Sequence, residues 1–111
     1  MSQEQDIQQI EYKVKIGLTI DNDYDKNYYS IAIRVEGYTT IGEKRLAGAE
    51  ETVIYGINGE NVRKVTREDI ENVIADFKKR IAERFAEALK IYNTVKQYSE
   101  ENGYDFGFRV I

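Results

Sequence analysis

The side chains that could do chemistry in this chain are carboxylates, lysines, arginines and tyrosines, because its 111 residues include no histidine and no cysteine. Histidine is the commonest general base and the commonest ligand of transition metals, and cysteine supplies thiolate nucleophiles. Their absence excludes the Ser-His-Asp and Cys-His catalytic arrangements and thiolate metal sites. The sequence also places no carboxylate in an apolar pocket, so no raised pKa of an acid catalyst can be argued. We predict a protein that is not an enzyme and that needs no cofactor.

Three aspartates have the spacing of the first half of a calcium-binding loop, namely Asp21, Asp23 and Asp25. In such a loop the next positions of importance are a glycine and a bidentate glutamate, and here these positions hold Lys26 and Ala32. We therefore interpret the aspartates as part of a solvated loop between two strands, and we predict no metal site.

A basic cluster in the middle of the expected helix could contact phosphate groups, and it consists of Lys78, Lys79, Arg80 and Arg84. Acidic residues lie close to it on the same helix. Asp76 and Arg80 are four residues apart, as are Lys79 and Glu83, and pairs with this spacing attract each other on a helix surface. A salt-bridged face exposed to solvent is therefore the simpler interpretation of this cluster, and nucleic-acid binding is the alternative.

Tyrosine, lysine and arginine also gather on the expected solvent-facing side of the sheet. On an open sheet, such residues can stack on bases and pair with phosphates. They are also ordinary for the exposed face of an antiparallel sheet. The candidate ligand-binding residues of this face are Lys13, Lys15, Tyr28, Arg34 and Arg109.

The overall charge argues against nucleic acid as the main partner. The chain has 16 basic and 20 acidic residues, so its net charge of −4 provides no general attraction to phosphate. No apolar run approaches the roughly 20 residues that cross a membrane. The first nine residues are polar and acidic, unlike a signal peptide. We expect a soluble cytoplasmic protein.

Apolar residues that alternate with polar residues predict most of the strands. The polar segment 21–27 would join the first two strands as an antiparallel hairpin. Asn58-Gly59 predicts a tight two-residue turn, because both of its central positions need positive φ. The segment 40–49 is ambiguous between a loop and an irregular edge. The expected strands are residues 10–20, 28–39, 51–57, 60–65 and 104–111.

One long amphipathic helix is expected from about residue 67 to 101. Thr66 and Asp69 form a capping-box pattern at its start, apolar residues then recur every three or four positions, and Asn102-Gly103 provides a stop. The predicted fold class is α+β, with an antiparallel sheet of four to five strands packed on this helix. The order is three strands, an optional fourth, the helix and a last strand. We expect one domain over residues 9–111, preceded by a disordered tail at 1–8.

The expected helix is too long for a compact domain. Its length would be about 52 Å, whereas a compact chain of this size has a radius of gyration of about 13 Å and a diameter of about 34 Å. Either the helix breaks near Asn93-Thr94 and folds back on its own sheet, or its second half packs on another copy. We favour a homodimer or higher oligomer, with an interface made of Ala82, Phe85, Leu89, Tyr92, Val95 and Tyr98.

Two functional hypotheses follow from these observations. The first is a non-enzymatic, self-associating interaction protein that binds another protein. The composition is rich in Ile, Tyr, Lys and Asn and would suit an AT-rich genome, so a viral or mobile-element protein that binds a host factor is one concrete version. The alternative is a protein that binds nucleic acid or a nucleotide-like ligand through the sheet face or the basic helix cluster.

Overall fold

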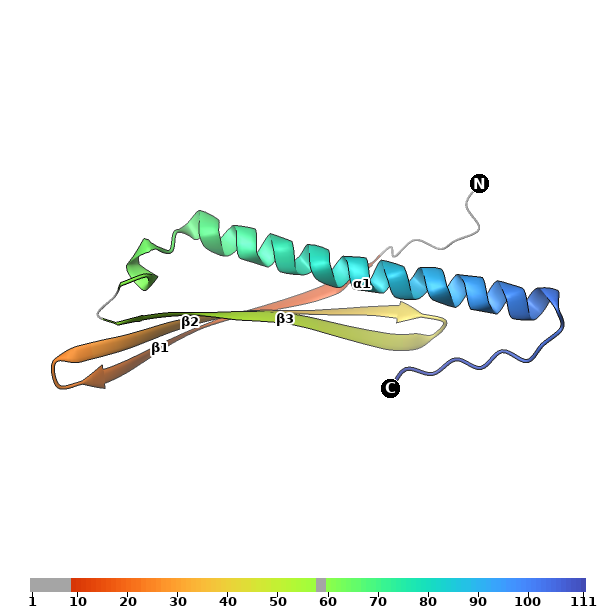
Figure 1. The fold of residues 1–111 in the computed structure, drawn as a ribbon, viewed down its shortest axis with the longest axis horizontal. Helices are drawn as coiled ribbons and strands as arrows, with labels where there is room; N and C mark the ends of the chain where they lie inside the picture. Colours follow the sequence, from red (N-terminus) through yellow and green to blue (C-terminus); the bar gives the residue numbers. More distant parts are fainter. Residues whose placement is uncertain (1–8, 58–59) are drawn as a thin grey trace.

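Three long antiparallel strands and one long helix make up the fold (Figure 1). A computed structural model describes residues 9–57 and 60–111 of the chain. The sheet has the order β1-β2-β3, so β2 is central and β1 and β3 form the edges. The elements are β1 (Glu11–Asp23), β2 (Lys26–Ile41), β3 (Lys44–Ile57), the short 3-10 helix η1 (Val62–Lys64) and α1 (Arg67–Glu101).

Both connections within the sheet are tight turns. Asp23 pairs with Lys26, so the first turn is much shorter than the predicted loop at 21–27. Ile41 pairs with Lys44, and the intervening Gly42 and Glu43 have φ angles of 53° and 68°. Positive φ at both central residues is what a two-residue hairpin requires. The ambiguous segment 40–49 is therefore the β2–β3 hairpin.

The helix crosses the sheet where the backbone can approach most closely. Gly37 and Gly48 pair across β2 and β3, and Ile81 of α1, which is fully buried, lies over them. A Cβ atom on Gly37 would lie only 2.6 Å from Cγ2 of Ile81. Around this crossing point lies the core, made of Ile33, Val35, Phe77, Ile81 and Phe85.

The predicted helix ends are confirmed. The Asp69 amide donates to Oγ1 of Thr66 at 3.0 Å, and the Thr66 amide donates to the Asp69 carboxylate at 2.9 Å, which completes a capping box. At the other end Gly103 has a φ of 67°, a left-handed conformation that glycine adopts without strain. The helix continues through Asn93-Thr94 without a break.

The prediction of four to five strands was wrong, because within residues 9–57 and 60–111 the sheet has three strands. Residues 60–65 contain η1 instead of a return strand. The predicted hairpin turn Asn58-Gly59 and the predicted disordered tail at 1–8 lie outside the described residues. Residues 104–110 run back without strand pairing, because their alternating aromatic rings pack on the helix. Phe106 and Phe108 both contact Tyr92 edge-on, with ring centroids 5.6 and 4.8 Å away.

The sheet matches the helix in length, which explains how a long helix fits without breaking. The molecule measures 71 × 28 × 15 Å and has a radius of gyration of 20.2 Å, against about 13 Å for a compact chain of this length. The 16 residues of β2 span about 53 Å at 3.3 Å per residue, close to the length of α1. The expectation of a compact body was therefore wrong, although the antiparallel sheet on one long helix is confirmed.

Candidate interaction surface

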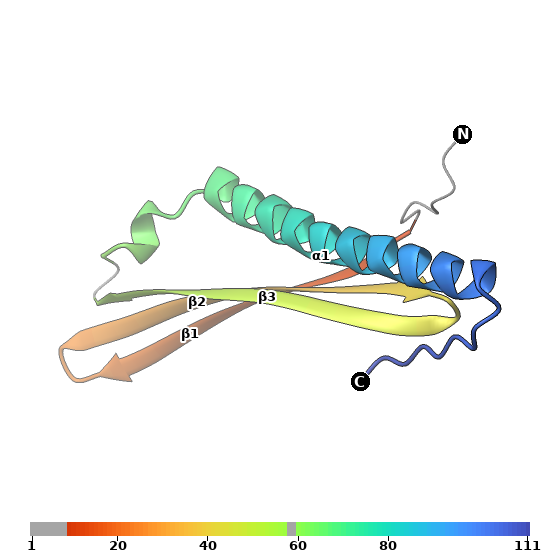
Figure 2. The same ribbon diagram turned by 45° about the vertical axis from the view of Figure 1, so that its right-hand side comes forward.

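The helix covers only part of the sheet and leaves most of β1 uncovered (Figures 1 and 2). Four apolar residues of β1 pair with β2 residues on the face that carries the helix. They are nevertheless 38–62% exposed. We call them the β1 stripe: Val14, Ile16, Leu18 and Ile20.

The helix contacts β1 at one end of that strand. The Tyr12 hydroxyl donates to the Lys78 carbonyl at 3.2 Å, and the Lys78 ammonium lies 5.3 Å from the centre of the Tyr12 ring. Beyond Tyr12 the strand diverges from the helix towards the β1–β2 turn (Figure 2). The β1 stripe begins there, so it forms a continuous apolar row that the helix does not cover.

Ion pairs draw the helix towards the opposite edge. The Glu50 carboxylate of β3 accepts hydrogen bonds from Arg84 at 3.0 Å and from Arg80 at 3.4 Å. The hydrogen bond from Arg84 is the main reason why the pKa of Glu50 lies below its usual value, against the opposing effect of burial. Arg84 also donates to the Ala49 carbonyl at 3.4 Å. These contacts fix α1 over β2 and β3.

The free edge of β1 is a second feature of this surface. Within residues 9–57 and 60–111, the neighbour of β1 in the sheet is β2 alone. An edge strand presents backbone N–H and C=O groups on its outer side, where another strand can pair with them. The β1 stripe and an unpaired backbone edge thus lie along the same strand.

Four of the five predicted ligand-binding residues lie on one face of the sheet, and two of them, Lys15 and Arg34, are paired with glutamates. Lys13, Lys15, Tyr28 and Arg34 all lie on the face opposite the helix. Glu36 lies between two of them, 3.5 Å from Lys15 and 3.3 Å from Arg34. Burial alone would raise the pKa of Glu36, but these two cations bring it below its usual value. Arg34 also lies 3.8 Å from Glu51, and Arg109 belongs to the C-terminal segment instead of the sheet.

The predicted basic helix cluster does not converge on one surface. Lys78 lies over the ring of Tyr12, on the β1 side of the helix. Arg80 and Arg84 bind Glu50 on the β3 side, and Arg80 also lies 3.1 Å from Asp76. Lys79 is exposed between these two sides. Because Arg80 and Arg84 are paired with carboxylates and the two lysines lie away from them, the cluster offers no single basic surface to phosphate.

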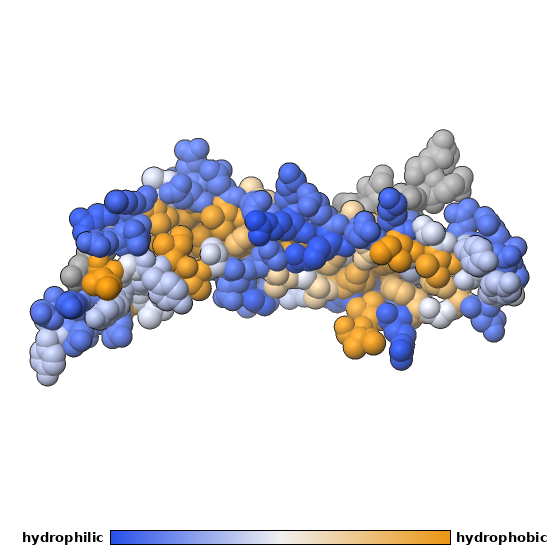
Figure 3. All heavy atoms as spheres, in the orientation of Figure 1, coloured by the Kyte–Doolittle hydropathy of each residue, from blue (hydrophilic) through white to orange (hydrophobic). Residues whose placement is uncertain are grey.

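The predicted helix interface divides into buried and exposed parts. Phe85 and Leu89 are 4% and 6% exposed, so a partner could not reach them. Ala82 is half-buried and Tyr92 packs against the C-terminal segment. Val95 and Tyr98 remain exposed, together with Ile91. Apolar side chains are visible over this end of α1 in Figure 3, so it forms a second, smaller apolar patch.

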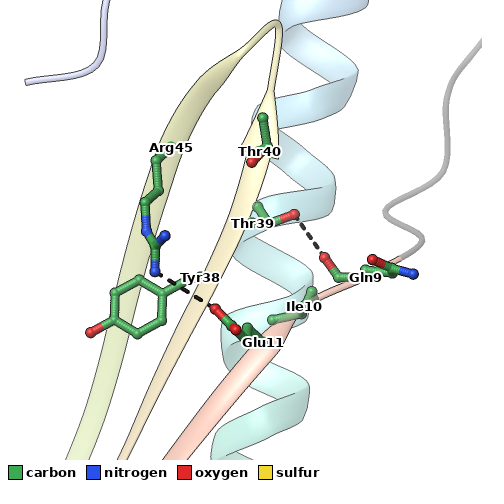
Figure 4. Close-up of a pocket in the computed structure, with 7 residues that line it drawn as sticks. All are labelled: Gln9, Ile10, Glu11, Tyr38, Thr39, Thr40 and Arg45. Carbon is green, nitrogen blue, oxygen red and sulfur yellow. Dashed lines mark hydrogen bonds and ion pairs between the residues drawn. The ribbon is translucent and has the colours of Figure 1, made fainter.

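An open cavity of about 620 Å³ lies where β1 begins, beside the β2–β3 hairpin (Figure 4). Its polar groups are largely satisfied by one another. Arg45 lies 4.5 Å from the centre of the Tyr38 ring and 3.7 Å from the Glu11 carboxylate. The Thr39 hydroxyl donates to the Gln9 carbonyl at 3.1 Å. The cavity therefore presents few unpaired groups for a ligand.

Metal and membrane sites find no support in the part of the chain that the structure describes. It contains no group of three acidic residues, including Asp21, Asp23 and Asp25, that could hold a metal ion. No helix there is both long and apolar enough to cross a membrane. Comparisons with models of protein families, with curated proteins and with solved structures gave no match. The candidate surface must therefore be interpreted from its own chemistry.

Alternation in the sequence correctly grouped the β1 stripe on one face but predicted that this face is buried. The width of a helix compared with the spacing of strands could have corrected this prediction. A helix about 10 Å across covers roughly two strands that are spaced 4.8 Å apart, so one helix cannot cover three. What the sequence could not show was which edge strand remains uncovered, because that depends on the contacts of Glu50.

Proposed function

We propose that this protein is a non-enzymatic, self-associating interaction protein, and that the β1 stripe carries the association. The observation that supports this most directly is the exposure of Ile16, Leu18 and Ile20, each more than half exposed in an otherwise well-formed sheet. Contiguous exposed apolar residues on a soluble protein are typical of interaction sites.

The total surface supports the same proposal. The accessible surface of the chain is 8582 Å², whereas a folded monomer of 12.9 kDa has about 6300 Å². A stable interface buries about 1200–2000 Å² in total, so the excess is large enough to accommodate one. Association of two copies would also double the net charge of −4, which suits a basic protein partner.

The test is to replace Leu18 with serine and to measure the molar mass by light scattering at increasing protein concentration. Leu18 is 62% exposed, so Leu18→Ser should leave the fold intact while it removes apolar contact area from both copies. We expect the wild-type protein to associate at micromolar concentration and the variant to associate at least about tenfold more weakly.

Two matched variants make the result specific. Tyr55→Ser changes an exposed apolar residue of β3, and Val95→Ser changes the patch on the helix; they are 70% and 47% exposed. Neither should affect association. If Val95→Ser weakens it and Leu18→Ser does not, self-association stands but occurs through the helix. A wild-type protein that is monomeric at several hundred micromolar would exclude the proposal.

A further inference from the structure

The charges on β1 are ordered along the strand. On the face opposite the helix, Lys13 and Lys15 lie near its start and Asp21 and Asp23 near its end. The residues between them on this face are the uncharged Gly17 and Thr19. Glu11, the first residue of β1 on this face, lies 3.7 Å from Arg45, so from Lys13 onward this face of β1 has a basic end and an acidic end.

The geometry points to antiparallel pairing of β1 with β1 of a second copy, which would join two sheets into one of six strands, three from each copy. This inference rests on the proposed self-association and names its interface. Parallel pairing would place lysines beside lysines and aspartates beside aspartates, which is unfavourable. Antiparallel pairing instead places the basic end of one strand beside the acidic end of the other.

One register satisfies both faces of the strand. With Leu18 opposite Leu18 of the second copy, Ile16 lies opposite Ile20 and Val14 opposite Asn22, so Ile16, Leu18 and Ile20 of the two β1 stripes meet on the helix side. On the other face Lys15 then lies opposite Asp21, and Lys13 opposite Asp23, with Cβ atoms about 5 Å apart. A shift by two residues that pairs Lys13 with Asp21 instead brings Glu11 opposite Asp23, where like charges repel.

The backbone is oriented for this pairing. Arg84 donates to the Ala49 carbonyl and Asn61 to the Tyr55 carbonyl, so the odd-numbered residues of β3 direct their carbonyls away from β2. Backbone groups alternate in direction along a strand. Through the register of the sheet, the even-numbered residues of β1 then direct their N–H and C=O groups outward. These residues include the β1 stripe, so the proposed pairing also satisfies the outward backbone groups of the stripe.

The pairing should stop at two copies. It uses the same edge of both, related by a two-fold axis, so each copy is left with β3 as its only free edge. The contacts of Arg84 and Asn61 already occupy carbonyls along that edge. We therefore expect a closed dimer instead of a fibre.

The experiment uses two full-length variants with opposite charges on β1. The acidic variant carries Lys13→Asp and Lys15→Asp, and the basic variant carries Asp21→Lys and Asp23→Lys. Each variant alone would place like charges opposite each other at every charged pair, so its dimer should weaken by about tenfold to a hundredfold. An equimolar mixture restores opposite charges, and it should form a dimer as tight as the wild type or tighter.

Light scattering of each variant and of the mixture distinguishes the outcomes. Monomeric variants that form a dimer when mixed would support the inference, and they would also show that both variants fold. Variants that still dimerise alone would overturn this interface while self-association stands, and a monomeric wild type would overturn both. Variants that stay monomeric when mixed, or wild-type assemblies larger than two copies, would overturn the antiparallel closed dimer.

Amide exchange followed by NMR provides a second readout that does not depend on affinity. In the wild-type dimer the amides of Val14, Ile16, Leu18 and Ile20 should exchange slowly. In either variant alone they should exchange as fast as those of an open edge. Equal exchange in wild type and variants would overturn the proposed pairing, because no edge amide would then change its partner.

Discussion

The two edges of the sheet, β1 and β3, differ in how they are protected. Along β3, Glu50 binds two arginines of α1. The side chains of Arg84 and Asn61 also donate hydrogen bonds to backbone carbonyls of this strand. Along β1, the apolar residues of the stripe lie on the helix side of the sheet, but the helix does not cover them. They are up to 62% exposed. Edge strands usually carry features that prevent pairing with other chains. Here contacts from α1 and from Asn61 occupy carbonyls of the β3 edge, whereas the protecting features of β1 are the charged side chains of its own outer face.

The difference teaches that the position of the helix, more than the strand sequences, decides which edge is available. Both edge strands alternate apolar and polar residues. The helix rests on the glycine pair Gly37 and Gly48 and is held by Glu50, so it covers the helix-facing side of β3 and leaves that side of β1 accessible. Two kinds of experiment test this explanation. One weakens the contacts of the helix with the sheet, and the other asks whether β1 binds nucleic acid instead of a second copy.

The largest effect is expected at the point where the helix crosses the sheet. Ile81→Ala removes a fully buried side chain and leaves a cavity, so it should lower the free energy of unfolding by about 3 kcal/mol. The matched substitution Leu18→Ala on the exposed β1 stripe should cost the monomer less than about 1 kcal/mol. Urea denaturation at low protein concentration measures both values. Equal losses would contradict the contrast between a covered and an uncovered edge.

A smaller effect, which depends on pH, is expected from the ion pairs of Glu50 with Arg80 and Arg84, which we call the Glu50 clamp. Because the pKa of Glu50 is lower in the folded protein than its ordinary value of 4.5, the carboxylate stabilises the fold above that pH. This contribution is lost as the pH falls through the lower pKa of the folded state. Glu50→Gln should therefore reduce the melting temperature at neutral pH and flatten its decrease below about pH 4.5.

The control for this prediction is Glu83→Gln, which changes an exposed glutamate of α1. It should leave the pH dependence of the melting temperature as in the wild type. Thermal melts followed by circular dichroism between neutral pH and about pH 3 provide the comparison. A Glu50→Gln curve that is parallel to the wild-type curve over this range would show that the clamp contributes little to holding the helix over β3.

Local sequence signals predicted the helix closely and the sheet incompletely. The capping pair Thr66 and Asp69, the apolar spacing and Gly103 defined α1 because each acts within a few residues. The β2–β3 hairpin was missed because its turn is Gly42-Glu43 instead of a common turn pair. Gly42 is needed there for two reasons: its φ is positive, and a Cβ atom would lie 2.5 Å from the Tyr92 hydroxyl. The second reason involves a residue of α1 that no local pattern reveals.

The C-terminal segment that was predicted to be the last strand shows where alternation fails as a predictor. Phe106 and Phe108 alternate with Asp105 and Gly107 as in a strand, but their rings pack on Tyr92 at the end of the helix. A period of two records only that one side of an extended chain is apolar. It does not record whether the backbone has a neighbouring strand. The same ambiguity applies to β1, whose apolar side is exposed.

The last prediction is that the face of β1 opposite the helix does not bind nucleic acid. Lys13 and Lys15 would contact phosphate if this face bound nucleic acid, whereas we assign them to Asp23 and Asp21 of a second copy. Net charge is negative, and Arg34 on the same face already lies beside Glu36 and Glu51. We therefore expect no gel shift of single- or double-stranded DNA or RNA at low salt with micromolar protein.

The basic variant Asp21→Lys with Asp23→Lys is the positive comparison, because it places four lysines on one strand face and removes the acidic end. A shift by the wild-type protein that is lost in Lys13→Ala and falls steeply with salt would assign the face to phosphate instead. In that outcome the exposed stripe would still need a partner, but the charges of β1 would no longer identify that partner as a second copy.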